Sequence, residues 1–405
     1  LPTPDTEEYH RYVGAFEGAG YCERGRYRPS HTCLMRSRQE VMCAVCRHER
    51  DQYVIGLEQV RDAEEEHWRR REEQIGRQAA REERERRLEE YTLSEQERID
   101  RCHHVQRIDG ANMYATAANI SQALFPNGAS TVILATDQEF STDAMAAGPL
   151  AASLGAPFMP VGRNSLSPYT KAEIERLGAR KVIIVGGRIS VTPLVTRELK
   201  KMGLEVERIS GMTRFKTARE IAMELHKIQG STSKSAFIVA ADNISIRASI
   251  TAGSLAAALN APVLFVKHDS IPRSTARTLR ELGIEHTYVV GGLGRINEAV
   301  FADLPGAERV NADTIYSLAT TLATQAMDDE LTDRSRFFIA HGDRPSDSVA
   351  ASTGGHIILL TETERLNIFT RGFFEKHSRD TVILGDESVI SENVRDELCE
   401  FLPPI

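Results

Sequence analysis

A short sequence pattern that begins with Arg occurs three times along this chain at nearly constant spacing. Arg107, Arg208 and Arg309 each precede an apolar residue, and successive copies lie 101 residues apart. A second interval of 105 residues separates Ala156-Pro157 from Ala261-Pro262. Repetition at a fixed period is typical of structural units that stack on their neighbours to bury a shared core. We therefore expect three modules of common architecture.

Length and composition agree with several globular modules. The 405 residues are 41% hydrophobic and 27% charged, which is ordinary for a soluble protein. The net charge of -8 gives no case for nucleic-acid binding. No apolar stretch approaches the roughly 18–20 residues that cross a bilayer, so we expect no membrane span. The chain begins at Leu1, which indicates either a removed signal peptide or trimming.

Short apolar runs alternate with amphipathic segments inside each copy. A β-branched run such as Val182-Ile183-Ile184-Val185 is typical of a strand buried on both faces, and strands separated by helices require parallel crossovers. The sequence predicts an α/β fold of small parallel-sheet repeats at 105–206, 207–307 and 308–405. In the first repeat, we expect helices over 113–124, 142–154, 168–177 and 191–201, and strands over 131–135, 158–161 and 181–185.

The N-terminal extension differs from the repeats, because its first hundred residues contain many Arg but no Lys. Residues 1–52 form a Cys-rich segment, and residues 53–104 are predicted to be a long charged helix with a connector. Pairs such as Glu66 and Arg70 stand at the i,i+4 spacing that supports a helix. Apolar positions are too sparse for a sustained coiled-coil seam. The helix is therefore expected to be a solvated spacer, with homo-oligomerisation through it as an alternative.

Six cysteines leave two alternatives for the extension, which holds four of them. Disulfides fit an even number of cysteines in a small extracellular segment. Zinc is the competitor, because Cys43 and Cys46 have CxxC spacing and Cys22 and Cys33 could complete a four-thiolate site. We expect disulfides and no metal. The candidates are Cys22, Cys33, Cys43, Cys46, Cys102 and Cys399.

Further shared residues point to a known family. The first copy carries Gly155-Ala156-Pro157 and ends a strand with Gly186-Gly187; the second carries Arg208-Ile209-Ser210-Gly211, then Arg214-Phe215 and Gly291-Gly292. In combination these spacings resemble the type 2 cell-wall-binding repeat family, found in tandem threes on secreted proteins of Gram-positive bacteria. The resemblance implies three repeats about a pseudo-threefold axis. It also implies non-covalent attachment to an anionic cell-wall polymer.

The copies are not equivalent. The Arg before the aromatic residue is present only as Arg214, with Met113 and Ile315 in its place elsewhere. The third copy lacks the Ala-Pro turn and has Gly385-Asp386 instead of paired glycines, although it keeps Ile358-Leu359-Leu360. Family ligand contacts are thus expected in only some copies, or in none.

Open α/β sheets bind ligands beyond the carboxyl ends of their strands, and cations there would suit an anionic polymer. Most surface cations are simply solvated, and Arg214 could instead bridge repeats. Acidic residues near strand ends could hold a divalent cation, but Asp in such places more often caps a helix. The candidate ligand contacts are Arg163, Arg188, Arg214, Lys267, His268 and Arg295. The acidic residues are Asp137, Asp143, Asp242, Asp343 and Asp347.

Ring closure gives one specific expectation. Cys102 opens the first repeat and Cys399 closes the third. A closed ring of three repeats would bring them within the ~4.4–6.8 Å Cα separation that a disulfide requires.

Catalytic signatures are missing from the sequence, which has no GxSxG, HExxH or phosphate loop. The glycine turn ending at Asn297 lacks the last glycine of a dinucleotide fingerprint, so no cofactor is expected. We predict a non-catalytic, extracellular, wall-associated protein that anchors to an anionic polymer. The alternative is a structural subunit of an extracellular assembly, such as a surface layer, filament or phage particle, whose partners are other surface subunits. A divergent α/β hydrolase or sugar-processing enzyme is a third hypothesis.

Overall fold

The computed structural model divides into two compact units, Leu1–Glu95 and Gln96–Ile405. In the second unit it describes residues 100–402 except 139–140, 231–232, 243–244, 311, 313 and 329–335. In the first unit it describes residues 16–17, 27–28, 66, 69–71, 76–79, 81–83 and 85–86. Cys22, Cys33, Cys43 and Cys46 lie outside the described residues, so the choice between disulfides and zinc there remains a prediction.

The N-terminal unit departs from the single long helix that the sequence predicts. Residues 69–71 and 77–79 are helical, but Gly76 between them has a left-handed φ of 86°. Arg71 Nη2 lies 2.9 Å from Glu83 Oε2, whereas two residues twelve apart in one helix would be separated by about 18 Å. The chain therefore reverses near Gly76, since a left-handed glycine ends a helix readily. The expected ion pair between Glu66 and Arg70 is present at 3.2 Å.

Among the described residues of this unit there is also a short antiparallel pair, β1 (Phe16–Glu17) with β2 (Tyr27–Arg28). Oligomerisation through the charged helices stays a prediction. Among the residues described, no helix is both long and apolar enough to cross a membrane.

The first module of the second unit is a parallel sheet in the order β5-β4-β6-β7. All seven elements predicted for it from sequence are found, with one helix divided in two at Gly148-Pro149 because proline favours the first turn of a new helix. The fourth strand, β7, was not predicted. The strands are β4 (Thr131–Thr136), β5 (Phe158–Val161), β6 (Lys181–Val185) and β7 (Glu205–Ile209); the helices are α4 (Met113–Leu124), α5 (Thr142–Ala146), α6 (Gly148–Ser153), α7 (Pro168–Leu177) and α8 (Pro193–Lys201).

The second module repeats this architecture with its sheet in the order β9-β8-β10-β11. Its fourth strand again follows its third strand through one short helix. The strands are β8 (Ser235–Ala240), β9 (Val263–Val266), β10 (His286–Val290) and β11 (Ala307–Val310); the helices are α9 (Arg214–Gln229), α10 (Ser245–Ala258), α11 (Arg273–Glu281) and α12 (Glu298–Ala302).

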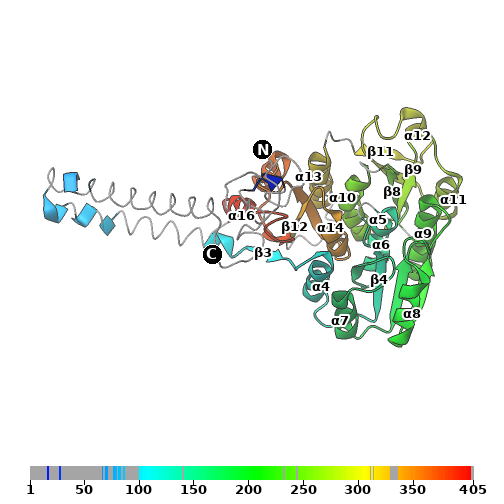
Figure 1. The fold of residues 1–405 in the computed structure, drawn as a ribbon. Helices are drawn as coiled ribbons and strands as arrows, with labels where there is room; N and C mark the ends of the chain where they lie inside the picture. The colour runs from blue at the N-terminus through cyan, green and yellow to red at the C-terminus, as the bar shows by residue number, and fades with distance from the viewer. Residues whose placement is uncertain are drawn as a thin grey trace. The chain divides into compact units, whose positions relative to one another are not determined.

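The third module has the same strand order but takes its fourth strand from the start of the repeats (Figure 1). Strand β3 (Val105–Ile108) pairs in parallel with β14, with Val105 opposite Thr381 and Ile108 opposite Leu384. Each sequence repeat therefore opens with a strand of the preceding module's sheet, and the modules form a closed ring. The other elements are β12 (Arg336–His341), β13 (Ile357–Thr361), β14 (Asp380–Leu384), α13 (Ile315–Asp328), α14 (Pro345–Ser352), α15 (Ile368–Phe374) and α16 (Glu392–Cys399).

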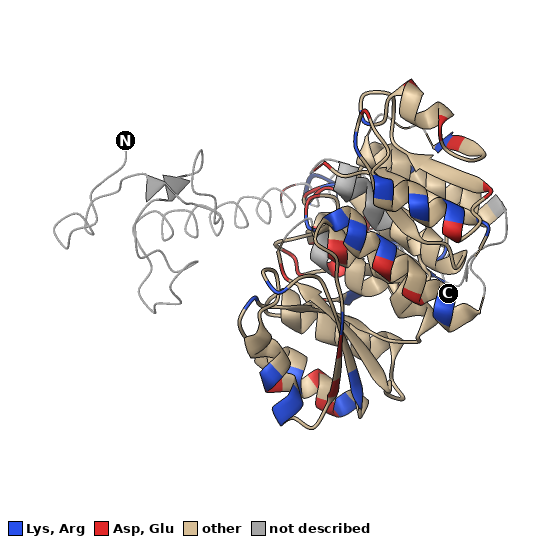
Figure 2. Ribbon diagram, turned by 90° about the vertical axis from the view of Figure 1, so that its right-hand side faces the viewer, with Lys and Arg blue, Asp and Glu red and all other residues tan. Residues whose placement is uncertain are grey.

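Helices α6, α10 and α14 contact one another at the centre of the ring. A Cβ on Gly148 would lie 2.9 Å from Ser352 Oγ and 3.6 Å from the carbonyl oxygen of Gly253. These three residues occupy equivalent positions in the three repeats, so small side chains allow the helices to meet about a pseudo-threefold axis. One hydrophobic core runs through all three modules. Charged side chains of both signs are spread over the outer helices and loops (Figure 2).

Candidate functional site

The Arg that marks each repeat lies on the fourth strand and fastens the turn after the third strand. In every module its guanidinium donates to the carbonyl of the glycine that begins the turn, and each of these glycines has a left-handed φ of 102° to 113°. The marker arginines are therefore structural. The Nη1 to carbonyl distances are 2.8 Å for Arg208 and Gly186, 3.1 Å for Arg309 and Gly291, and 2.8 Å for Arg107 and Gly385.

The three marker arginines differ in what neutralises them. Arg107 Nη2 lies 2.8 Å from Glu392, and Arg309 Nη2 lies 3.6 Å from Glu298. Arg208 instead donates to the hydroxyl of Thr196 at 3.2 Å. Burial, together with the charge of Arg188, lowers the pKa of Arg208. The marker arginine thus pairs with an acid in the second and third modules and with a hydroxyl in the first.

Arg208 belongs to a cleft of about 1120 Å³ between the first module and the start of the second. Its walls are the carboxyl end of β4, the start of α5, the turn after β6 and the first turns of α9. Four cations and two acids line it, so the cleft is net positive. The cations are Arg188, Arg208, Arg214 and Lys216, and the acids are Asp143 and Glu220.

Asp143 joins the two modules inside the cleft. It accepts a hydrogen bond from the hydroxyl of Thr217, which in turn accepts one from the backbone N–H of Gly211 at 3.1 Å. Burial raises the pKa of Asp143, and the hydrogen bond from Thr217 and the charge of Arg214 oppose this shift without cancelling it. Arg214, the first residue of α9, also donates to the carbonyl of Ala241 at 2.9 Å. This hydrogen bond lies within the second repeat, while the charge of Arg214 acts on Asp143 of the first repeat across the cleft.

Two of the six basic residues predicted as ligand contacts, Arg188 and Arg214, line this cleft. Arg163 is exposed after β5, and Lys267 and His268 are exposed after β9, all away from the cleft lining. Arg295 forms an ion pair with Asp242 at 3.6 Å.

Sequence reasoning missed Arg208 and Lys216 as cleft residues. Arg208 was visible only as a marker of the repeat, and a repeated position does not tell whether a side chain faces a ligand. Lys216 gave no signal, because its relevance depends on where α9 begins relative to the first module.

The equivalent positions around the other two module boundaries lack these cations. At the second boundary, Leu293 and Ile315 stand where Arg188 and Arg214 stand in the first. At the third boundary, Glu387 and Met113 occupy the same places. Lys216 corresponds to Ser317 and Ala115. The first boundary thus carries three cations that the aligned positions of the other two boundaries lack.

The acidic residues near strand ends have protein partners. The hydroxyl of Tyr114 donates to Asp137, and burial together with this hydrogen bond raises the pKa of Tyr114 to about 12. Asp242 pairs with Arg295, as described above. Asp347 is buried, with its Oδ2 3.4 Å from where a Cβ on Gly385 would lie.

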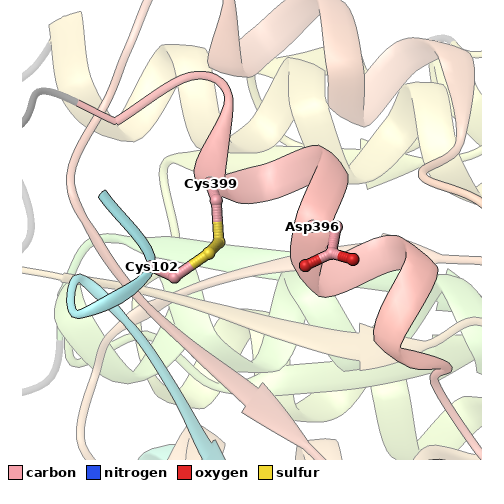
Figure 3. A group of neighbouring side chains, drawn as sticks. All are labelled: Cys102, Asp396 and Cys399. Atoms are coloured by element: carbon pink, nitrogen blue, oxygen red, sulfur yellow. A yellow bond between two sulfur atoms is a disulfide. The ribbon is translucent and has the colours of Figure 1, made fainter. Parts of the chain in front are cut away.

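Cys102 and Cys399 are joined by a disulfide in the structure, with their Cα atoms 4.8 Å apart (Figure 3). Asp396 lies close to both sulfur atoms on the preceding turn of α16. A metal would require free thiolates, and here both sulfurs bond to each other. The Cα separation of 4.8 Å lies within the ~4.4–6.8 Å that a disulfide requires, as expected if the ring closes.

The fold and the cleft together define a class: a tandem α/β module for binding, with no catalytic constellation recognised in the described residues. The sequence model of cell wall binding domain 2 (CWB2) matches residues 107–196 and 208–301. Through these two repeats the chain is similar to the CWB2 family. The third repeat shares their fold while lying outside the matched residues.

Two curated proteins of Bacillus subtilis (strain 168) are similar to the repeats. N-acetylmuramoyl-L-alanine amidase LytC is 30% identical over 300 residues, which is 73% of this chain and 58% of LytC. Amidase enhancer is 28% identical over 196 residues, which is 48% of this chain and 25% of that protein. The chain therefore spans little more than half of LytC.

Two solved structures share the fold. Cwp6 from Clostridium difficile aligns with a TM-score of 0.67 and 22% identity, over 74% of this chain and 48% of Cwp6. Cwp8 from Clostridium difficile aligns with a TM-score of 0.63 and 23% identity, over 73% of this chain and 51% of Cwp8. At these identities the likeness concerns the fold, and it confirms the predicted three-repeat α/β architecture.

The N-terminal segment has a different relationship. The sequence model of IgA Peptidase M64 matches residues 5–53, which include β1 and β2. The matched segment contains no HExxH sequence.

Proposed function

We propose that this protein attaches non-covalently to an anionic polymer of the bacterial cell wall, outside the cell, and that the first inter-module cleft holds the polymer. The CWB2 repeats support the wall as the target. The observation that supports the site is the group of four cations around one cleft, with two acids beside them. A polymer carrying phosphate or carboxylate groups would accept charge-assisted hydrogen bonds from these side chains.

The arrangement of the cations suits a polymer better than a small enclosed ligand. Arg188 and Lys216 are exposed on the cleft rim, whereas Arg208 is half-buried at its base. Ile189 and Met212 flank the cleft and are 81% and 90% exposed, which provides apolar contact for the uncharged parts of a chain. Rim cations speed encounter and lose strength with salt, so retention on the wall would depend on ionic strength.

The function in this proposal is binding without catalysis. The similarity of residues 5–53 to IgA Peptidase M64 favours a second candidate, in which the repeats carry a peptidase-related unit to the wall. Release of peptides from a protein substrate by the full chain, blocked by a metal chelator, would support that candidate.

A sedimentation assay with purified Gram-positive cell walls tests the binding proposal. Arg188→Ala and Lys216→Ala should each weaken retention by about three- to tenfold, as expected for loss of one partly exposed charged contact. Lys267→Ala is the matched control, because it removes the same charge from an exposed loop outside the cleft, and it should bind like the native chain. Walls stripped of their anionic polymers should retain little of any variant. Equal retention by stripped and intact walls would contradict the proposal and leave protein–protein packing as the use of the repeats.

A further inference from the structure

Closure of the third module is non-local, unlike that of the other two. The fourth strands β7 and β11 each follow the third strand of their own sheet after a single helix. Strand β3 instead reaches β14 from the opposite end of the repeats, so that Ile108 pairs with Leu384. Ordering two segments so far apart in sequence loses more chain entropy than a local crossover does. The closing strand thus needs stronger fastening than its counterparts.

The contacts that hold β3 are few, because the strand has four residues. At its start, the backbone N–H of Thr381 donates to the carbonyl of His104 at 2.8 Å, and His104 Nδ1 lies 2.7 Å from Asp380 Oδ1. At its end, Arg107 donates to the carbonyls of Gly385 and Ile390 at 2.8 and 2.9 Å.

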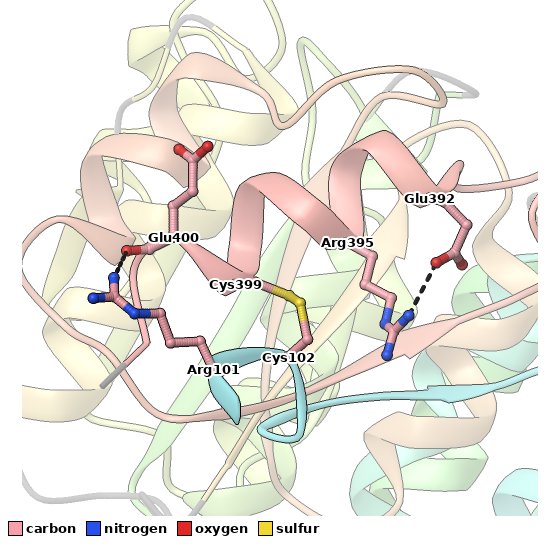
Figure 4. The surroundings of a disulfide bond; sticks show 6 residues. All are labelled: Arg101, Cys102, Glu392, Arg395, Cys399 and Glu400. Carbon is pink, nitrogen blue, oxygen red and sulfur yellow. Dashed lines mark hydrogen bonds and ion pairs between the residues drawn. A yellow bond between two sulfur atoms is a disulfide. The ribbon is translucent and has the colours of Figure 1, made fainter. Parts of the chain in front are cut away.

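The disulfide joins the segment just before this strand to the end of α16 (Figure 4). Cys102 precedes β3 by three residues, and Cys399 is the last residue of α16. Both cysteines are buried, as are Val394 and Leu398 on the same helix. Beside the bridge, Arg101 donates to the carbonyl of Glu400 at 3.5 Å. A displacement of the chain before residue 101 therefore reaches the covalent bridge before it reaches the hydrogen bonds of β3.

We propose that the Cys102–Cys399 disulfide is a redox-sensitive latch that keeps the closing strand β3 in the third sheet. While the bridge is intact, a displacement of the chain before Arg101 is transmitted to α16 and not to β3. Reduction by a dithiol transfers two electrons and two protons to the S–S bond, giving two thiols and the cyclic disulfide of the reductant. The edge of the third sheet then opens while the first two sheets stay closed. This inference concerns ring closure and does not rest on wall binding.

Hydrogen exchange of the full chain tests the latch. In Cys102→Ser/Cys399→Ser, backbone amides of residues 105–108 should exchange at least tenfold faster than in the native chain, and those of β14 should also accelerate. Amides of β4 and β6 in the first sheet should stay within about twofold, because that sheet closes locally. Arg101→Ala, which loses a neighbouring contact but keeps the bridge, should match the native chain.

Treatment of the native chain with dithiothreitol provides the same comparison without mutation, should the double variant not fold. Selective acceleration at β3 on reduction supports the latch. Unchanged exchange at β3 would overturn it, and so would equal acceleration in all three sheets, which would show a general stabilising role. Mass spectrometry of the untreated chain must find the two cysteines bonded to each other. Free thiols, or bonds to other cysteines, would also overturn the proposal.

Discussion

Arg107 donates a hydrogen bond to the carbonyl of Gly385 at 2.8 Å across 278 residues of chain. The equivalent Arg208 makes the same contact with Gly186 across 22 residues. One repeated side chain thus serves a local turn in the first module and ring closure in the third. Strand β7 follows its sheet's third strand locally, whereas β3 comes from the opposite end of the repeats to pair with β14. The contact of Arg107 therefore helps to close the ring.

Arg107→Ala should destabilise the protein by about 2–4 kcal/mol, because the lost side chain is only 13% exposed and is the donor to the carbonyls of Gly385 and Ile390. Glu392 would keep only its contact with Arg395. Arg107→Lys should not restore stability, since an ammonium group cannot reproduce the planar fork. Denaturant unfolding measures both. The nearby Arg101→Ala should stay within about 0.5 kcal/mol of the native chain. Equal stability of Arg107→Ala and Arg101→Ala would show that the marker arginine does not fasten the ring.

Gly148→Ala should destabilise the centre of the ring by about 1–2 kcal/mol, because the new Cβ would lie 2.9 Å from Ser352 Oγ. The double variant Gly148→Ala/Ser352→Gly should recover most of this loss. Gly372→Ala is the control in another helix, where a Cβ meets nothing within 4 Å, and it should be neutral or slightly stabilising. The free energies of unfolding form a double-mutant cycle. An additive cycle would mean that the two positions do not meet.

Asp143 should make wall binding depend on pH. Burial raises its pKa above the ordinary value, so in the folded protein it takes up a proton at a higher pH than an exposed Asp does. Its contribution to stability is therefore greatest at low pH and is lost as the pH rises through the folded-state pKa. Protonation also removes a negative charge from the cleft, so retention on purified walls should increase as the pH falls.

Asp143→Asn isolates this effect from titration of the polymer. The variant should bind more tightly than the native chain at pH 7, and the difference between them should shrink as the pH falls. A difference that is constant with pH would show that Asp143 does not titrate in the binding range.

Leu293→Arg/Glu298→Gln should improve wall retention by converting the second boundary toward the first. The first change adds a cation where Arg188 stands in the preceding module, and the second removes the acid 3.6 Å from Arg309. Both side chains are exposed, so folding should be preserved. The salt concentration that releases the protein from walls should rise. Leu194→Arg/Glu308→Gln makes the same charge change at exposed residues away from the boundary and should have little effect. Equal gains in the two double variants would indicate general charge attraction.

The sequence determined the repeated unit and most of its elements. The run ending at Val185 identifies a buried strand because an apolar β-branched run between helices has few other uses in a globular protein. The fourth strand was missed because β7, Glu-Val-Glu-Arg-Ile, is a half-exposed edge strand with charged residues and resembles a connector. The division at Gly76 was missed because an isolated glycine is tolerated inside a helix as well as at its end.

The candidate site was only partly within reach of sequence reasoning. Arg188 was identified from its place just beyond a strand-end glycine pair, and Arg214 from the resemblance to the repeat family. Their meeting with Lys216 and Asp143 depends on two modules packing together. Spacing along one module cannot give the distance to the next. The substitutions at the other boundaries were visible in the sequence, but their meaning appeared only when equivalent positions were placed at the three module boundaries.

By itself the sequence determined three α/β modules with buried parallel strands, since hydrophobic periodicity and turn residues act over a few residues. Tertiary structure alone decided that β3 completes the third sheet, that small residues meet at the ring's centre and that Arg188, Arg208, Arg214 and Lys216 line one cleft. Each of these depends on segments a hundred or more residues apart being brought into contact. The energy of such contacts comes from packing between modules, and no local pattern records it.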